Sequence, residues 1–412
     1  MKGSSIFRLV SILAALTAAL VFPAHTAKSQ DVGVGGGAGI FRPRNPETRK
    51  RTSRTATPVV RRGSTRTPAN TAAVNAALEE QIEDLLEKGN EFRDARRFAE
   101  AVTSYQEVLK LKPRDGRAAY GLGNVYSDQQ RWDTAETAYR NAVSWSPSDV
   151  ESLVALSVVL VQPRTGAGNA KRLADAEAFA RRAVQIDPKN AVAWDRLGVA
   201  LQARGLVNNE TEHSYRRAVE IDPQFAAAYA HLARALNKLG RRDEAATLYQ
   251  QAATLAKDPA TLNLIAESLQ EEQQWQNSEP ILKRSLELDP RGAPALYMLG
   301  RMLVVFKRFQ EAEPHLKLAH EVNQKAFEPV NLLGRTYLAL DRYEEAEVTY
   351  ERAAGLATPA DRKQLAGEFG FEGVGDGFMK RKNKAGAARA YQRALQLDPA
   401  NRDLERKLAQ AR

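Results

Sequence analysis

The sequence contains no cysteine among its 412 residues. Disulfide frameworks, thiolate zinc sites and cysteine nucleophiles are therefore excluded. Histidine is also scarce, because the chain has only five. Two of these, His315 and His320, are five residues apart, so they do not share a helix face as paired metal ligands do. We expect neither a metal site nor a cofactor.

The short motifs of common enzymes are missing as well. The sequence has no GxxxxGK[ST] phosphate loop and no Gly-x-Ser-x-Gly nucleophile elbow. A GxGxG string at residues 373–377 follows no predicted strand, which a dinucleotide-binding loop requires. Acidic pairs such as Glu344 and Glu345 are typical of helix starts. We therefore predict that the protein is not an enzyme.

Long apolar runs are absent except near the N-terminus. Lys2 and Arg8 precede an uncharged stretch of 14 residues, Leu9–Phe22, and small residues follow up to Ser29. This stretch is shorter than the roughly 20 residues that cross a bilayer as a helix. The layout is typical of a secretory signal peptide over residues 1–29. We expect an exported protein of the bacterial periplasm or cell envelope, and an uncleaved N-terminal anchor is the alternative.

The net charge of +10 is concentrated in a short part of the chain. Residues 1–27 carry two basic residues and residues 28–75 carry ten against two acidic ones, which leaves 48 basic and 48 acidic residues from 76 onward. A groove for nucleic acid needs a surplus of Lys and Arg in the folded part. No nucleic-acid partner is therefore expected.

Residues 30–75 are rich in Gly, Arg, Thr and Pro and show no apolar periodicity. Such a segment cannot bury enough surface to offset its ordering entropy, so we predict a disordered linker. Its basic residues favour a solvated, self-repelling spacer. The alternative is contact with an anionic envelope surface, a polymer or a membrane.

The rest of the chain repeats itself with a period near 34 residues. The units share an apolar-charged-proline ending, as at Ile221-Asp-Pro223 and Leu288-Asp-Pro290. We number each unit so that this proline is residue 32 of the unit. The residue at position 8 is then always small, the residue at position 11 is always large and apolar, and the residue at position 24 is mostly tyrosine. Apolar residues at positions 4, 7, 8 and 11 share one face of a helix. Each unit is therefore predicted to form two helices, which must stack on the helices of neighbouring units to bury their apolar faces.

This pattern resembles the tetratricopeptide repeat family. The resemblance implies an all-α fold, a right-handed α-solenoid of about nine helix-turn-helix repeats with a concave groove. The predicted array covers residues 76–401, and residues 402–412 read as a C-terminal capping helix. The predicted units are 82–115, 116–149, 150–190, 191–225, 226–258, 259–292, 293–326, 327–360 and 368–401.

Three features depart from the regular repeat. Extra residues near 162–168 predict a longer turn inside the third unit, and others lie at the junction 357–367. The ninth unit has four glycines in its expected first helix, at 370, 373, 375 and 377. Because glycine destabilises helix interiors, we expect that helix to be frayed or loose. Residues 72–86 look helical and are expected to extend the first helix.

The resemblance also implies that the first helix of each unit lines the groove through positions 2, 5, 9 and 12. In the middle of the array these positions hold Arg, Asn and Tyr, which are typical of binding surfaces. The candidate peptide-binding residues are Arg234, Asn237, Asn263, Tyr297, Arg301, Asn331 and Arg335. An alternative is that they are solvated residues, with the arginines paired to nearby acids such as Glu267.

The main functional hypothesis is an exported scaffold or adaptor that binds proteins or peptides in the groove. A second hypothesis is an envelope assembly factor whose basic linker touches anionic polymer or membrane. A third is a carbohydrate-binding or enzymatic role, for which the sequence offers no cluster of acids and aromatics.

Overall fold

A computed structural model describes residues 69–163 and 168–412. Every regular element in these two ranges is an α-helix, which confirms the predicted all-α solenoid of repeated helix pairs. The predicted signal peptide lies outside the described residues, as does the linker up to residue 68. Within the part of the chain that is described, no helix is long and apolar enough to cross a membrane.

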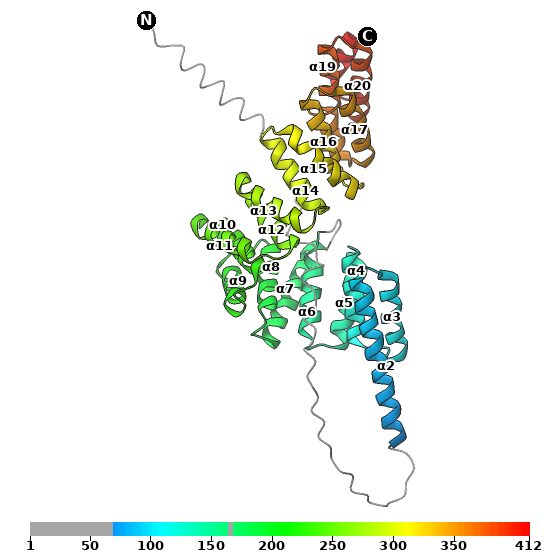
Figure 1. Ribbon diagram of the computed structural model, residues 1–412, viewed down its shortest axis with the longest axis vertical. Helices are drawn as coiled ribbons and strands as arrows, with labels where there is room; N and C mark the ends of the chain where they lie inside the picture. The colour runs from blue at the N-terminus through cyan, green and yellow to red at the C-terminus, as the bar shows by residue number, and fades with distance from the viewer. Residues whose placement is uncertain (1–68, 164–167) are drawn as a thin grey trace, which may run out of the picture. The chain divides into compact units, whose positions relative to one another are not determined.

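The helices before residue 256 form one compact unit, here called the N-terminal unit (Figure 1). Its helices are α2 (Ala69–Asp94), α3 (Phe98–Leu111), α4 (Gly116–Asp128), α5 (Trp132–Trp145), α6 (Val150–Val161), α7 (Asn169–Ile186), α8 (Ala191–Ala203), α9 (Asn209–Ile221), α10 (Ala226–Lys238) and α11 (Arg242–Leu255).

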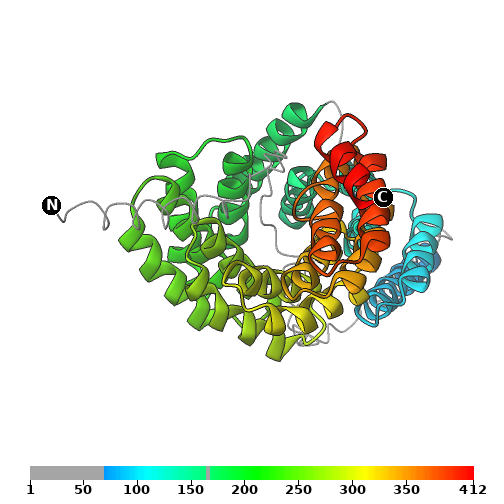
Figure 2. The same ribbon diagram turned by 90° about the horizontal axis from the view of Figure 1, so that it is seen from above.

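The second compact unit, the C-terminal unit, comprises residues 256–412. Figure 2 shows its helix pairs from yellow-green to red, following one another in chain order. Its helices are α12 (Pro259–Glu271), α13 (Trp275–Leu288), α14 (Ala293–Val305), α15 (Phe309–Val322), α16 (Phe327–Ala339), α17 (Tyr343–Leu356), α18 (Pro359–Ala366), α19 (Phe371–Lys380), α20 (Lys384–Leu397) and α21 (Arg402–Ala411).

The helices pack in the predicted pairs, for example α4 with α5 and α14 with α15. The first helices of successive pairs also contact one another, as α12, α14 and α16 do, and we call them the inner row. Local sequence sets where several of them start. Asp115, Asp149 and Asp258 each cap a helix by accepting hydrogen bonds from backbone N–H groups of its first turn.

The small residue at position 8 and the tyrosine at position 24 meet, as the sequence predicts. A Cβ atom on Gly198 would lie 2.5 Å from the ring of Tyr215, and one on Gly334 would lie 2.5 Å from the ring of Tyr350. Tyr215 and Tyr350 are fully buried. Glycine at position 8 therefore leaves room for the tyrosine ring between the two helices of one repeat.

The expectation of a frayed first helix in the ninth unit is wrong. Helix α19 is formed from Phe371 to Lys380, and two of its glycines lie under aromatic rings. A Cβ atom on Gly375 would collide with Tyr391, and one on Gly377 would collide with Tyr343. Burial of those rings offsets the low helix propensity of glycine.

The extra residues between the eighth and ninth units form a short helix, α18, which the repeat pattern did not predict. Thr358 and Asp361 make a reciprocal capping box, and Pro359 occupies the first turn. Both are helix-start signals that the sequence displays. One further boundary differs from the predicted one. Helix α2 begins at Ala69, so residues 69–75 of the predicted linker are helical. In the long turn of the third unit, residues 164–167 lie outside the described ranges.

Candidate functional site

All seven candidate groove residues lie on inner-row helices. Arg234 and Asn237 lie on α10 of the N-terminal unit. The other five lie in the C-terminal unit, where α12 holds Asn263, α14 holds Tyr297 and Arg301, and α16 holds Asn331 and Arg335. The two groups therefore belong to separate compact units.

Arg301 is the centre of the group in the C-terminal unit. Its Nη2 donates a hydrogen bond to Oε1 of Gln270 at 2.6 Å. Its guanidinium lies 5.3 Å from the ring centre of Trp275 and 5.7 Å from that of Tyr297. The Nε atom has no hydrogen-bond partner within the described chain. No carboxylate of the described residues forms an ion pair with Arg301, so the predicted alternative of pairing to an acid is not observed for this side chain.

Gln270 is itself fixed in position. Its side chain is 2% exposed, and its amide Nε2 donates to Oγ of Ser278 at 3.2 Å and to the carbonyl oxygen of Met298 at 3.1 Å. With both amide hydrogens engaged, Oε1 must point toward Arg301. The guanidinium is thus held in one orientation before any ligand arrives, which lowers the entropy cost of binding.

Arg335 lies on α16, the following inner-row helix, and its charge acts on Tyr297. Its guanidinium is 5.0 Å from the ring centre of Phe369. Burial lowers the pKa of Arg335, while Tyr350 and Tyr297 act in the opposite direction. Burial raises the pKa of Tyr297, and both Arg301 and Arg335 oppose that rise. The structure therefore brings Tyr297, Arg301 and Arg335 together.

The two asparagines of this unit are less available than the sequence indicates. Asn263 accepts a hydrogen bond from Oγ of Ser285 at 2.8 Å. Asn331 is 7% exposed and is therefore largely enclosed by its neighbours. Their amides contribute to the interior of the unit, so the surface that can meet a ligand is mainly arginine and aromatic.

In the N-terminal unit, the predicted groove residues Arg234 and Asn237 differ in burial. Arg234 is 5% exposed, and its charge lowers the pKa of the buried Tyr215, which burial raises. Asn237 is half-buried near the end of α10.

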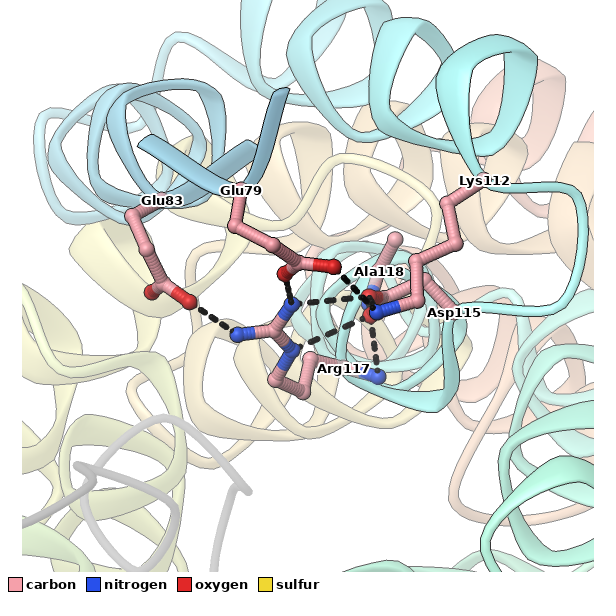
Figure 3. A network of polar contacts seen from close by, with 6 residues as sticks. All are labelled: Glu79, Glu83, Lys112, Asp115, Arg117 and Ala118. Atoms are coloured by element: carbon pink, nitrogen blue, oxygen red, sulfur yellow. Dashed lines mark hydrogen bonds and ion pairs between the residues drawn. The ribbon is translucent and has the colours of Figure 1, made fainter. Parts of the chain in front are cut away.

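The first repeats use their inner-row polar groups internally. Asn90 accepts a hydrogen bond from the hydroxyl of Tyr105 at 2.8 Å, and Asn124 accepts one from Tyr139 at 2.7 Å. Figure 3 shows Arg117 among acids, with its Nη2 2.8 Å from Asp115 and its Nη1 bonded to Glu83. These inner-row groups are satisfied within the chain.

Sequence reasoning missed three residues of the site, namely Gln270, Trp275 and Phe369. Gln270 occupies position 12 of its unit, a groove position by the family rule, so position alone would have found it. Trp275 opens α13, and Phe369 precedes α19, so both belong to other elements than the arginines they contact. Among the described residues, no group of three or more His, Asp or Glu side chains is placed to hold a metal ion.

Solved structures overlap parts of the chain. A crystal structure of MamA is 23% identical and covers 40% of this chain and 93% of its own, with a TM-score of 0.35. TTC0263, a thermophilic TPR protein in Thermus thermophilus, is 22% identical over 46% of this chain and 98% of its own, with a TM-score of 0.39. YrrB, a TPR protein with an unusual peptide-binding site, is 20% identical over 50% and 98%, with a TM-score of 0.36. No curated protein sequence matches the chain.

Family models match most of the helical array. Residues 328–358 match the model described as Tetratricopeptide repeat. Residues 69–329, more than half of the chain, match the model described as Cilia and flagella-associated protein 70 C-terminal domain. The chain therefore belongs to the tetratricopeptide repeat proteins, in the family of that C-terminal domain.

Proposed function

We propose that this protein is an interaction scaffold that binds an extended, acid-bearing segment of a partner protein on the inner row of its C-terminal unit. Arg301 carries the proposal, with Tyr297 and Arg335 beside it. Membership of a repeat family whose helices stack into a continuous surface supports a role in protein binding.

The chemistry of Arg301 favours an acidic ligand. Its guanidinium is oriented by Gln270 and flanked by Trp275 and Tyr297, yet no described carboxylate neutralises it. A preorganised arginine can form two parallel hydrogen bonds with one carboxylate. Aromatic walls add apolar contact area for the neighbouring residues of the peptide.

Two arginines outside the inner row, Arg308 and Arg342, differ from Arg301 because each is paired with carboxylates. Arg308 lies 2.9 Å from Glu279 and 2.7 Å from Glu311, and Arg342 lies 2.6 Å from Glu313. Those guanidiniums already have carboxylate partners within the chain and have little to offer a ligand. The difference between Arg301 and these residues is the observation that singles out the inner-row site.

The proposal is tested by crosslinking in cells. A photoreactive benzoylphenylalanine replaces Tyr297, and the crosslinked partners are identified by mass spectrometry. The same substitution is then combined with R301E, with R301K, or with R291E as an exposed control. We expect R301E to abolish the crosslinked species, R301K to weaken it and R291E to leave it unchanged. Undiminished crosslinking in R301E would show that Arg301 does not hold the partner.

We further propose that the chain is exported, on the strength of the sequence of residues 1–29. Two basic residues, a 14-residue apolar stretch and small residues in that order support a signal peptide. N-terminal sequencing of the protein from fractionated bacterial cells tests this. A new N-terminus near residue 28 or 30 in the envelope fraction is expected. An intact Met1 in the cytosolic fraction would contradict export, and an intact Met1 in the membrane fraction would indicate an uncleaved anchor.

A further inference from the structure

The N-terminal unit encloses two adjacent charged residues in its inner row. Asp195 and Arg196 both lie on α8, and their side chains are 0% and 1% exposed. Charged side chains are buried to this degree only when other groups compensate the loss of water. The compensation differs for the two residues.

Asp195 is compensated by the next inner-row helix. Its Oδ1 lies 2.7 Å from Nδ1 of His231, which lies on α10. Burial alone would raise the pKa of Asp195, but His231 and Arg196 bring it below its ordinary value. The carboxylate therefore stays charged and keeps the imidazole in place.

Arg196 is not compensated in this way. Its Nε is 3.4 Å from Oδ2 of Asp195, which is close enough for charge attraction. Among the described residues, none of its three side-chain nitrogen atoms has a hydrogen-bond partner, and Oδ2 of Asp195 has none either. A guanidinium presents only donors and cannot lose its charge, so leaving them unfilled away from water is costly.

The surroundings of Arg196 combine aromatic rings and charges. The ring of His231 lies 5.5 Å from that of Tyr215, a fully buried residue of α9. Burial raises the pKa of Tyr215, and Asp195, Arg234 and Arg196 all act on it as nearby charges. Arg196 thus borders a closed cluster of rings and charges from α8, α9 and α10.

We infer that Arg196 is the anion-binding group of a second site, in the N-terminal unit, which takes a carboxylate. Two oxygens of one carboxylate match the fork of a guanidinium and would fill the donors that the chain leaves open. A doubly charged phosphate fits less well, because the adjacent Asp195 carboxylate would repel it more strongly. Asp195 and His231 act as positioning residues for Arg196.

Access to this site is restricted. Because Arg196 is 1% exposed, a carboxylate can reach it only through a local opening of the unit. The site therefore suits a single side chain or a chain end better than a broad surface. Slow association is expected as a consequence.

The test is thermal unfolding of the purified full chain, carried out in an R301Q background so that Arg301 of the C-terminal unit does not contribute to acid binding. Two probe peptides are added at about 10 mM, well above a weak dissociation constant. Acetyl-Ala-Ala-Ala carries only a terminal carboxylate, and acetyl-Glu-Glu-Glu-amide carries only side-chain carboxylates. A rise in the midpoint with the first identifies a chain end as the source, and a rise with the second identifies an acidic side chain.

The variant R196M tests whether Arg196 holds the peptide. R196M should abolish the response to peptide, and it should lower the midpoint without peptide because the buried Asp195 loses a nearby positive charge. R196K, which keeps the charge but loses the fork, is expected to fold and to bind the effective peptide at least about tenfold more weakly. R217M, at a partly exposed arginine of the same unit that pairs with Glu220, should leave the response to peptide unchanged.

Three results would overturn the inference. The first is that neither peptide stabilises the R301Q chain. The second is stabilisation that persists in R301Q/R196M, and the third is stabilisation of R301Q/R196K equal to that of the R301Q chain. Because the two sites lie in different units, each of these outcomes leaves the proposal for Arg301 standing.

Discussion

The guanidinium of Arg342 reaches back to the preceding repeat and lies 2.6 Å from the carboxylate of Glu313. The same arginine donates through Nε to Glu345 of its own repeat at 2.6 Å and lies 4.5 Å from the ring centre of Tyr337. Arg308 makes the equivalent bond to Glu279 and Arg241 to Glu212, each across 29 residues of sequence. We call these three Arg–Glu pairs the inter-repeat clasps.

The first prediction concerns how much one clasp contributes. A double-mutant cycle with E313Q and R342M should give a coupling free energy of about 0.5–1 kcal/mol in urea unfolding. The value is modest because the side chain of Arg342 is 35% exposed and water screens the pair. R291M, on an exposed turn, should leave the free energy of unfolding unchanged. A coupling indistinguishable from zero would show that the clasp is only a surface contact.

The second prediction concerns pH. Burial would raise the pKa of Glu313, but Lys317 and Arg342 hold it below its ordinary value. Hydrogen bonds from Lys283 and Arg308 likewise lower the pKa of Glu279. A depressed folded-state pKa stabilises the fold above the unfolded-state value, about 4.3, and this stabilisation is lost as the pH falls through the folded-state pKa.

The free energy of unfolding should therefore be steady from pH 7 to about 5 and fall below about pH 4.3. The variant E279Q/E313Q should start lower at pH 7 and fall less steeply on acidification. Urea titrations at several pH values measure both effects. Parallel pH profiles for the variant and the parent chain would mean that these two carboxylates do not contribute to acid unfolding.

The residue types that recur at single positions predicted the fold well. The small residue at position 8 and the tyrosine at position 24 recur because they contact each other within one repeat. Gly198 and Tyr215 meet as this pattern requires. The clasps were not predicted, although Arg at position 16 and Glu at position 21 recur at a fixed separation. Recognising them requires comparing residues across two repeats, and a polar pair leaves no trace in the hydrophobic pattern.

The candidate site was predicted in part. Groove positions identified Tyr297 and Arg301, but not Trp275, which comes from the second helix of the preceding repeat. Sequence position could not show that Asn331 is buried or that Gln270 is fixed by Ser278 and Met298. It also gave no sign that Arg196 would be enclosed without hydrogen-bond partners among the described residues, because burial depends on how neighbouring repeats stack.

The third prediction compares two glycines inside helices. A Cβ atom on Gly334 would lie 2.5 Å from the ring of Tyr350, whereas one on Gly355 would meet no atom within 4 Å. G334A should destabilise the chain by about 1–3 kcal/mol because the buried ring must shift. G355A should stabilise it by about 0.5–1 kcal/mol because alanine favours the helix. Urea unfolding of both variants checks the pair, and equal effects would refute the proposed role of the ring.

The fourth prediction concerns the turn between the two helices of a repeat. Lys307 and Gly240 occupy equivalent turn positions and adopt left-handed backbone conformations, with φ of 59° and 83°. An L residue in this region costs about 1–2 kcal/mol, while glycine loses about 0.5–1 kcal/mol more conformational entropy on folding. K307G should therefore stabilise the chain by about 0.5–1 kcal/mol, and G240A should destabilise it by a similar amount. Thermal midpoints that move in the same direction for both substitutions would show that contacts of these side chains, and not the backbone conformation, control the stability of the turn.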